Sequence, residues 1–381
     1  MLSILVFLIA VALVVGGTLS RRLDVAISLP LATALYGIIV LGPAVGRATL
    51  SAFNYSMFEV LSSLVLAMAL GYMMKDRREA LASGLTAVGP RFAAFAIPAA
   101  IGLLPMPGGA YVSAVVVDPL YREMRLSNQE KTYLNYWMRH IWIPIWPLFQ
   151  GVLITSAVLA EPVAKVISWS WPASIAAVTA GVVIGLPRVK KVEVGGRLRD
   201  LLALWPLAAV AILSFLAPIY VAVALVLIAF VVTYRVKAHA VLAAFRYALT
   251  PRILAIIISS LIFSEYIKES GLSALLAAYL GGAALLAVFA VPFLIGLATG
   301  VEFTFAGLAF PPLSALLHGY NLSLAFLGGF LGVMLSPAHS CFVLTLDYYK
   351  AEARDVYRFL TKSALVAVAV AAPLYAFLAA V

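Results

Sequence analysis

Long apolar runs separated by short charged segments make up most of the chain, and two of these runs share an unusual internal pattern. In each run, 97–120 and 291–313, a Pro near the start is followed by Ile-Gly and then by a Gly- or Pro-rich break. The Gly of the first pair, Gly102, precedes its counterpart Gly296 by 194 residues. Irregular backbone at membrane depth is tolerated only where protein or a water-filled cavity satisfies its polar groups. The matched breaks therefore predict a pair of re-entrant hairpins.

Ten other apolar segments are long enough to cross a bilayer, which requires about 20 residues of helix. Polar connectors at 75–89 and 269–282 precede the two hairpins and are expected to lie at the membrane surface. Each half of the chain then has three spans, a surface helix, a hairpin and two further spans. The predicted spans are 2–19, 26–45, 56–74, 132–159, 166–186, 200–217, 219–234, 252–267, 322–346 and 359–380.

Five crossings per half is an odd number, so the second half must be inverted relative to the first. We predict an all-α integral membrane protein built as an inverted repeat of two five-span halves, 1–187 and 200–381. Each half has a re-entrant helical hairpin, near 91–120 and 283–317, and a broken span after it. Residues 188–199 form a cytoplasmic linker. The hairpins would enter from opposite faces, so their tips are expected near the midplane.

The distribution of basic residues tests this topology independently. The chain has 26 Lys and Arg residues and a net charge of +10. If the N-terminus is outside, 22 of the 26 fall in cytoplasmic segments, which is the bias that the positive-inside rule requires. We therefore expect a multi-pass protein of the cell membrane with both termini on the extracytoplasmic side.

The composition supports a membrane protein and argues against other classes of protein. Hydrophobic residues make up 64% of the chain and charged residues 11%, which is too apolar for one water-soluble core. The basic residues lie between apolar runs and form no aromatic-interleaved patch, so nucleic acid is not an expected partner. A single cysteine, Cys341, excludes an internal disulfide and a Cys-built metal site.

The hairpin tips are the first candidates for a binding site. Free N–H groups at a helix N-terminus suit an anion, and free carbonyls at a C-terminus suit a cation. Glycine lets a ligand approach the backbone closely, and proline has no N–H to donate. Kinks filled by neighbouring helices are the alternative for either break taken alone. The candidate substrate-binding residues at the tips are Pro105, Met106, Pro107, Gly108, Gly109, Thr299 and Gly300.

The span after the first hairpin carries an arginine at membrane depth. Pro144 and Pro147 interrupt this span, and Asn135 and Arg139 share one helical face because they are four residues apart. An ionisable side chain inside a span is costly and indicates function. Asn135 and Arg139 are therefore candidates for substrate binding. Arg139 would hold a substrate carboxylate or pair with Glu302; the alternative is that it snorkels to the cytoplasmic interface.

The corresponding span of the second half is broken at Ser336, which precedes a Pro, and His339 follows. Ser336 and His140 are further candidates for substrate contact. Glu302 and His339 are candidates for ion coupling, because a carboxyl and an imidazole can titrate near neutral pH when buried. A satisfied structural donor is the alternative role for each histidine.

One acidic residue is expected to have a purely structural role. Asp118 directly precedes Pro119, a pair that is common at the start of a helix. The pattern predicts that Asp118 caps a helix beginning at Pro119.

Three motifs carry a resemblance to a known family: PMPGGA in the first hairpin, NYWMRHIW in the next span and SPAHSCFVLTLDYYK near the end. With the order of spans and hairpins, they resemble a prokaryotic membrane family, domain of unknown function 401, over nearly the whole chain. That family is similar in architecture to the ion transporter superfamily, which includes gluconate permeases, dicarboxylate and citrate carriers and sodium/proton antiporters.

The resemblance implies a scaffold region and a transport region that holds both hairpins, often in a homodimer whose transport region slides past the scaffold. Sodium-coupled dicarboxylate carriers of the superfamily have Ser-Asn-Thr-like tips, and neither tip here contains Asn. This departure weighs against sodium coupling and a dicarboxylate, and it favours proton coupling through Glu302.

We therefore expect a secondary active transporter, not an enzyme, that carries a small organic anion by elevator-type alternating access. A proton or sodium gradient would drive it, with H⁺ or Na⁺ as a bound coupling ion and with no cofactor or resident metal. A cation/proton antiporter is the alternative, although Glu302 is the one clear acidic residue for that role. A membrane-embedded lipid-modifying enzyme could use His140, His339 and a carboxylate, but the chain has no HExxH, nucleophile elbow or phosphate loop.

Overall fold

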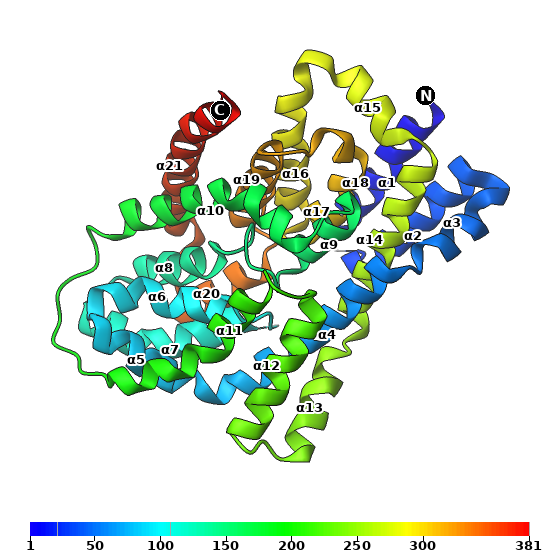
Figure 1. Ribbon diagram of the computed structural model, residues 1–381. Coiled ribbons are helices and arrows are strands. Elements are labelled where there is room, and N and C mark those ends of the chain that lie inside the picture. The colour runs from blue at the N-terminus through cyan, green and yellow to red at the C-terminus, as the bar shows by residue number, and fades with distance from the viewer. Residues whose placement is uncertain (21, 107, 381) are drawn as a thin grey trace. The chain divides into compact units, whose positions relative to one another are not determined.

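The structure is a computed structural model that describes residues 1–20, 22–106 and 108–380 (Figure 1). Every regular element in this described part is helical, as predicted. Short 3-10 and π turns join several helices; the longest is η4, Leu198–Leu204. The α-helices are α1 Leu2–Leu19, α2 Val25–Tyr36, α3 Val45–Ala52, α4 Tyr55–Met74, α5 Arg78–Val88, α6 Pro90–Gly102, α7 Gly109–Glu123, α8 Asn128–His140, α9 Gln150–Leu159, α10 Val163–Gly185, α11 Trp205–Leu213, α12 Ile219–Thr233, α13 Ala238–Ala248, α14 Pro251–Glu269, α15 Leu272–Leu280, α16 Ala284–Thr299, α17 Thr304–Leu308, α18 Phe310–Leu313, α19 Asn321–Leu335, α20 Ser340–Tyr349 and α21 Ala353–Ala380.

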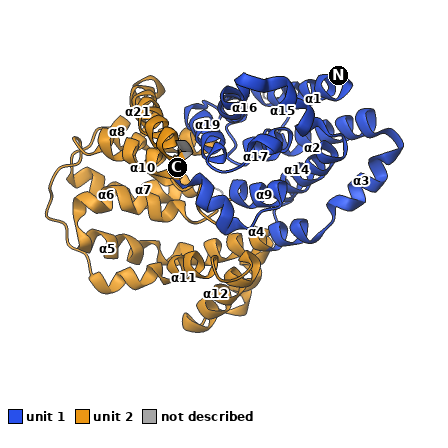
Figure 2. Ribbon diagram, turned by 45° about the horizontal axis from the view of Figure 1, so that its top comes forward, with its two compact units in different colours: residues 1–62, 150–171, 249–339 blue, residues 63–149, 172–248, 340–381 orange. Residues whose placement is uncertain are grey.

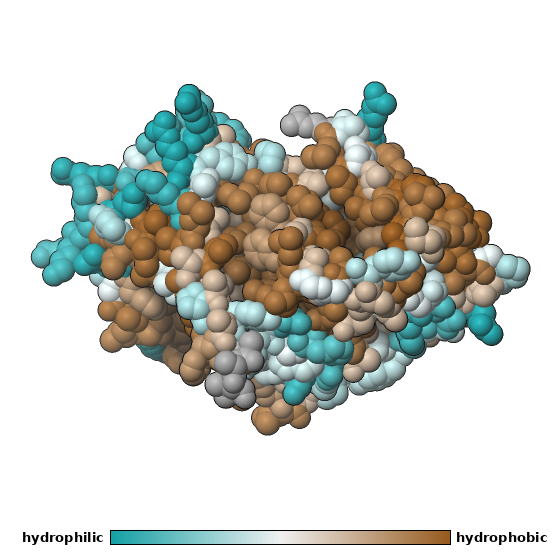
Figure 3. All heavy atoms as spheres, turned by 90° about the horizontal axis from the view of Figure 1, so that it is seen from above, coloured by the Kyte–Doolittle hydropathy of each residue, from teal (hydrophilic) through white to brown (hydrophobic). Residues whose placement is uncertain are grey.

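The helices have the length and surface of membrane spans. In the described residues, seven helical segments are long and apolar enough to cross a bilayer, and the bent pair α13–α14 is an eighth if counted as one span. Large apolar side chains such as Leu50, Leu216 and Leu286 are at least 70% exposed. Figure 3 shows apolar side chains over much of the face in view. Exposed apolar surface of this kind suits lipid, so the chain is a multi-pass membrane protein.

Both spans that were expected to be interrupted are interrupted. Residues 141–149 between α8 and α9 and residues 336–339 between α19 and α20 are not helical. Pro144, Pro147 and Pro337 lie in these breaks, where a missing N–H cannot continue a helix.

Two other predicted spans are shorter than expected. The segment 200–217 becomes η4 followed by α11, and 219–234 becomes α12, which has 15 residues. At 1.5 Å per residue, α12 is about 22 Å long and shorter than the roughly 30 Å apolar core of a bilayer.

The chain divides into two compact units, each assembled from separate stretches of sequence (Figure 2). Unit 1 contains α1–α3, α9 and α14–α19, and unit 2 contains α5–α8, α11–α13, α20 and α21. Each unit thus combines the first helices of one predicted half with the hairpin of the other. The predicted halves, 1–187 and 200–381, stay a prediction about sequence repetition and are not themselves the compact units.

One predicted cap is wrong. Helix α7 continues through Pro119 to Glu123, so Asp118 lies inside the helix and not at its start. The Asp118 carboxylate is buried and accepts from the Lys131 ammonium at 3.0 Å, and it also pairs with the Arg122 guanidinium at 2.6 Å. This buried ion pair ties α7 to the first turn of α8, whereas a sequence pattern shows only the local preference for a helix start.

In unit 1, α16 and α19 pack backbone to backbone through glycines. A Cβ added at Gly328 would overlap the Phe289 carbonyl, and one at Gly332 would overlap the Phe293 carbonyl. At Gly296 it would lie 2.7 Å from the carbonyl O of Gly329. Because contacts this close leave no room for adjustment, α16 and α19 form one rigid piece.

We predict that Gly332→Ala destabilises the protein, because the added methyl must displace the α16 backbone. Overpacking costs about 1–3 kcal/mol, and the higher helix propensity of Ala offsets up to about 1 kcal/mol of that. Thermal unfolding in detergent measures the effect. Gly282→Ala is the control, since its added Cβ would meet no atom within 4 Å. Equal midpoints for the two variants would contradict the close packing of α16 on α19.

Candidate functional site

The first hairpin lies in unit 2 and breaks between α6 and α7. Helix α6 ends at Gly102, and α7 begins at Gly109 after Gly108, which has the left-handed backbone conformation with φ +73°. The Gly109 N–H donates to the Met106 carbonyl at 3.2 Å. Pro107, a predicted tip residue, lies outside the described residues. The break therefore presents the N-terminal turn of α7, where the first N–H groups lack intrahelical partners.

Arg139 is buried against this break. It lies in the last turn of α8 and is 6% exposed, so it does not snorkel to a surface of unit 2. Its backbone carbonyl contacts Gly102 and its guanidinium lies against Gly109 so closely that a Cβ at either glycine would overlap it. Met106 also lies beside Gly109. The two glycines thus make room for the arginine at the tip.

The Arg139 guanidinium has no carboxylate partner within the described part of unit 2, and its Nε has no hydrogen-bond partner. A buried guanidinium without its hydrogen bonds is unfavourable by several kcal/mol. Its predicted pairing with Glu302 would join the two units, each of which is described by itself, and it stays a prediction. The buried charge with its unpaired Nε makes the tip of hairpin 1 a candidate anion site.

Asn135 shares a helical face with Arg139, as predicted, but its side chain is engaged in holding the hairpin. Its Nδ2 donates to the Ala110 carbonyl at 3.1 Å, and its Oδ1 accepts from the Ser113 hydroxyl at 2.5 Å. All three residues are buried. Asn135 therefore fixes the first turn of α7 on α8. Sequence reasoning missed Ser113, whose one signal is its position on the Asn135 side of α7, four residues after Gly109.

His140 follows Arg139 and is also buried. Its Nδ1 lies 2.6 Å from the Tyr136 carbonyl, and a carbonyl can only accept, so Nδ1 carries a proton. The Tyr136 ring packs edge-on to the imidazole with centroids 5.0 Å apart. These contacts fix the ring orientation, and in the neutral form they leave the lone pair on Nε2.

The second hairpin lies in unit 1 and has different chemistry. Helix α16 ends at Thr299, and Gly300 takes the left-handed conformation with φ +62° and donates its N–H to the Gly296 carbonyl at 2.8 Å. A Cβ at Gly300 would lie 2.6 Å from the backbone N of His339. The C-terminal end of α16 therefore lies against the non-helical segment that follows α19.

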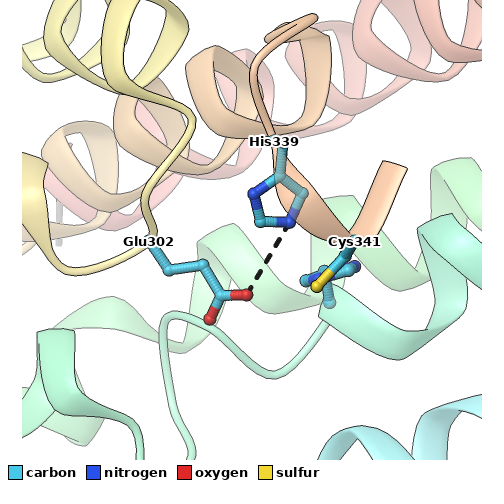
Figure 4. Close-up of side chains that lie close together, drawn as sticks. Glu302, His339 and Cys341 are labelled. Atoms are coloured by element: carbon cyan, nitrogen blue, oxygen red, sulfur yellow. Dashed lines mark ion pairs between the residues drawn. The ribbon is translucent and has the colours of Figure 1, made fainter. Parts of the chain in front are cut away.

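Glu302 and His339 face each other at this second break (Figure 4). The His339 Nδ1 donates to the Gly300 carbonyl at 2.5 Å, which leaves Nε2 directed at the Glu302 carboxylate, 3.9 Å away. The His339 side chain is 4% exposed and that of Glu302 is 19% exposed. The pair can share one titrating proton. On the carboxyl the proton leaves both groups neutral, and on the imidazole it gives an imidazolium beside a carboxylate. It is thus suited to bind a proton or a small cation.

The two predicted hydroxyl ligands are turned toward the backbone. Thr299 donates to the Ile295 carbonyl at 2.8 Å, and the Ser336 hydroxyl accepts from the Ala338 N–H at 3.2 Å. Both are buried. They stabilise the two breaks of unit 1, while their role as substrate ligands stays a prediction.

The two breaks are related in position but not in charge. The offset of 194 residues that pairs Gly102 with Gly296 also pairs Arg139 with Val333. Gly102 contacts the Arg139 backbone in unit 2, and a Cβ at Gly296 would lie 3.0 Å from the Val333 backbone N in unit 1. The backbone packing is alike, but the arginine has no counterpart.

Together these features define a multi-pass all-α membrane protein with two helix-break-helix hairpins, one beside a buried arginine and one beside a Glu–His pair. The chain belongs to the family described as Protein of unknown function (DUF401), whose model matches residues 1–378. This confirms the resemblance stated from the sequence. A comparison with curated protein sequences finds no match.

A solved structure shows the same fold. The crystal structure of the Alcanivorax borkumensis YdaH transporter, described as having an unusual topology, matches with a TM-score of 0.60 and 14% sequence identity. The match covers 89% of this chain and 86% of that chain. At this identity the likeness concerns the arrangement of the helices.

We predict that Arg139→Met and Asn135→Leu change stability in opposite directions although both lie on one face of α8. Methionine removes an unpaired buried charge and keeps the packing, so the free energy of unfolding should rise by about 1–3 kcal/mol. Leucine leaves the Ser113 hydroxyl without its partner and removes the second hydrogen bond of the Ala110 carbonyl, which costs about 1–3 kcal/mol. Thermal unfolding of the ligand-free protein in detergent compares them. Destabilisation by Arg139→Met would show that the guanidinium has a structural partner.

Proposed function

We propose that the protein is a secondary active transporter for a small organic anion with a carboxylate-like group. The observation that carries this proposal is the buried Arg139 guanidinium, unpaired at Nε, against the first turn of α7. The likeness of the fold to a protein described as a transporter supports the same class. A soluble or purely structural role offers no reason to keep an unpaired charge inside a membrane protein.

The anion would bind between the arginine and the helix end. The planar guanidinium can donate two parallel hydrogen bonds to a carboxylate. The N-terminus of α7 adds a partial positive charge, roughly half an elementary charge, and N–H donors. Gly108 leaves the backbone open at this point, since an added Cβ there would meet nothing within 4 Å. His140, the next residue along α8, is a further contact in this proposal.

Coupling would reside at the second break, in unit 1. Protonation of the Glu302–His339 pair changes its charge by one unit beside the Gly300 carbonyl at the end of α16. A proton is the coupling ion that this chemistry favours, and Na⁺ is the alternative. Because α16 and α19 form one rigid piece, hairpin 2 would move with α19, as elevator-type alternating access requires. We propose the inverted repeat, the homodimer and the extracytoplasmic termini as parts of this same arrangement.

A cation/proton antiporter is the second candidate, and the Glu302–His339 pair is the observation that favours it. An antiporter would move protons against a cation with no organic solute present. Measurement of proton flux in liposomes with and without organic acids separates the two functions.

We predict that Arg139→Met abolishes gradient-driven uptake of radiolabelled organic acids into proteoliposomes. Loss of a buried, charge-assisted contact costs about 3–5 kcal/mol, so the affinity for the organic acid should fall by roughly a hundredfold or more. Arg47→Ala serves as the control, because the Arg47 side chain is 79% exposed. Uptake by the Arg139→Met protein at the parent rate would refute the anion site.

We predict that Glu302→Gln uncouples uptake from an imposed pH gradient, because glutamine cannot exchange a proton with His339. Uptake by the variant should no longer accelerate when the pH difference is imposed, whereas counterflow of solute between two equal pools persists. Glu352→Gln, at an exposed position, is the matched control. A variant that keeps the full response to the pH gradient would place coupling elsewhere.

A further inference from the structure

We infer that the site at hairpin 1 accepts an organic acid with a single anionic group, a monocarboxylate, and discriminates against dicarboxylates. The inference rests on the proposed function and adds the number of charges that the cargo carries. It follows from a count of buried positive charge, and that count is independent of how the units are placed.

The described chain offers one buried cation to a ligand. Lys131 and Arg139 are its only lysine or arginine residues classed as buried. Lys131 is neutralised, since its ammonium lies 3.0 Å from the Asp118 carboxylate. Arg139 has no such partner within unit 2. A carboxylate reaching Arg139 from another part of the chain would only lower the positive charge that remains.

The second hairpin does not supply the missing charge. An inverted repeat could in principle hold a dicarboxylate with one cation from each half, but the position 194 residues after Arg139 is Val333. The ionisable groups at that break are Glu302 and His339. This pair is negative with no titrating proton, neutral with one and positive only when both groups are protonated. In every state but the last, a second carboxylate would be buried without compensation.

The observations point to a ligand independently of each other. The first turn of α7 opens on the break, and the arginine whose guanidinium lies against it is 6% exposed as a residue. Met106 lies beside Gly109 and adds an apolar side chain next to the charge, while the Tyr247 phenol interacts electrostatically with Arg139. One carboxylate on Arg139 and an uncharged remainder against Met106 would compensate the one unpaired charge.

The test measures binding of carbon-matched pairs to the purified full-length protein in detergent by titration calorimetry at neutral pH. Butyrate is compared with succinate and hexanoate with adipate, so that each pair has the same number of carbons and differs by one carboxylate. We expect the monocarboxylate of each pair to bind at least about tenfold more tightly, because burying an uncompensated carboxylate costs several kcal/mol.

Two variants test whether the monocarboxylate binds at hairpin 1. Gly109→Ala should weaken butyrate and hexanoate by about tenfold or more, because its methyl occupies the position of the Arg139 guanidinium. Arg139→Lys should do the same, since an ammonium cannot make the two parallel hydrogen bonds. Gly46→Ala, where an added Cβ meets nothing within 4 Å, should bind as the parent does.

The outcomes separate this inference from the proposed function. Succinate or adipate binding as tightly as its partner, with loss in Arg139→Lys, would overturn the single-charge inference and leave an anion carrier in place. Monocarboxylate binding that is unchanged in both Gly109→Ala and Arg139→Lys would overturn the site and the proposed function together. Failure of both monocarboxylates to bind the parent protein would overturn the single-charge inference as well.

Discussion

Wherever a helix breaks inside a bilayer, the freed backbone groups must find partners, and the rest of this structure depends on that constraint. Here each break satisfies part of its own backbone locally. Gly109 donates back into the first loop, Gly300 donates to Gly296, and His339 occupies the Gly300 carbonyl. What is left over is therefore specific: the N-terminal turn of α7 beside Arg139 at the first break, and the Glu302 carboxyl beside His339 at the second.

Glycine makes the breaks compatible with a packed core. Gly102 and Gly296 stand at the same offset in the two halves, and each lets its helix touch the backbone of the span that follows. The repeat thus preserves backbone contact and leaves side chains free to differ. Arg139 in one half and Val333 in the other show the result, because one backbone arrangement holds a buried arginine the first time and an apolar residue the second time.

Much of the fold could be predicted from sequence, and the limits have physical causes. The paired Ile-Gly breaks and the prolines at Pro144 and Pro337 located the interruptions, because these residues act through local backbone geometry. Compact units assembled from separate segments could not be predicted, since packing between distant helices leaves no local signal. Asp118 was misassigned for the same reason: its partner Lys131 lies on the next helix.

The sequence predicted which residues lie together at the first break better than it predicted their roles. Spacing showed that Asn135 and Arg139 share a face, but not which of them was already satisfied. The structure gives Asn135 two partners on α7 and leaves the Arg139 Nε without one. Hydrogen-bond direction depends on the positions of both partners, so a single sequence cannot supply it.

An unpaired arginine is consistent with carriage in a way that a permanent ion pair is not. A carboxylate fixed beside Arg139 would compete with every incoming anion and would lower its affinity. A guanidinium that the surrounding structure holds in place without a carboxylate partner can form its ion pair with the ligand alone. The neighbouring turn of α8 holds Arg139 in place. There the Trp137 indole donates to the Ala177 carbonyl at 2.9 Å, and the Asn135 side chain donates to a backbone carbonyl of α7. These contacts stabilise unit 2 around a buried arginine whose Nε has no partner.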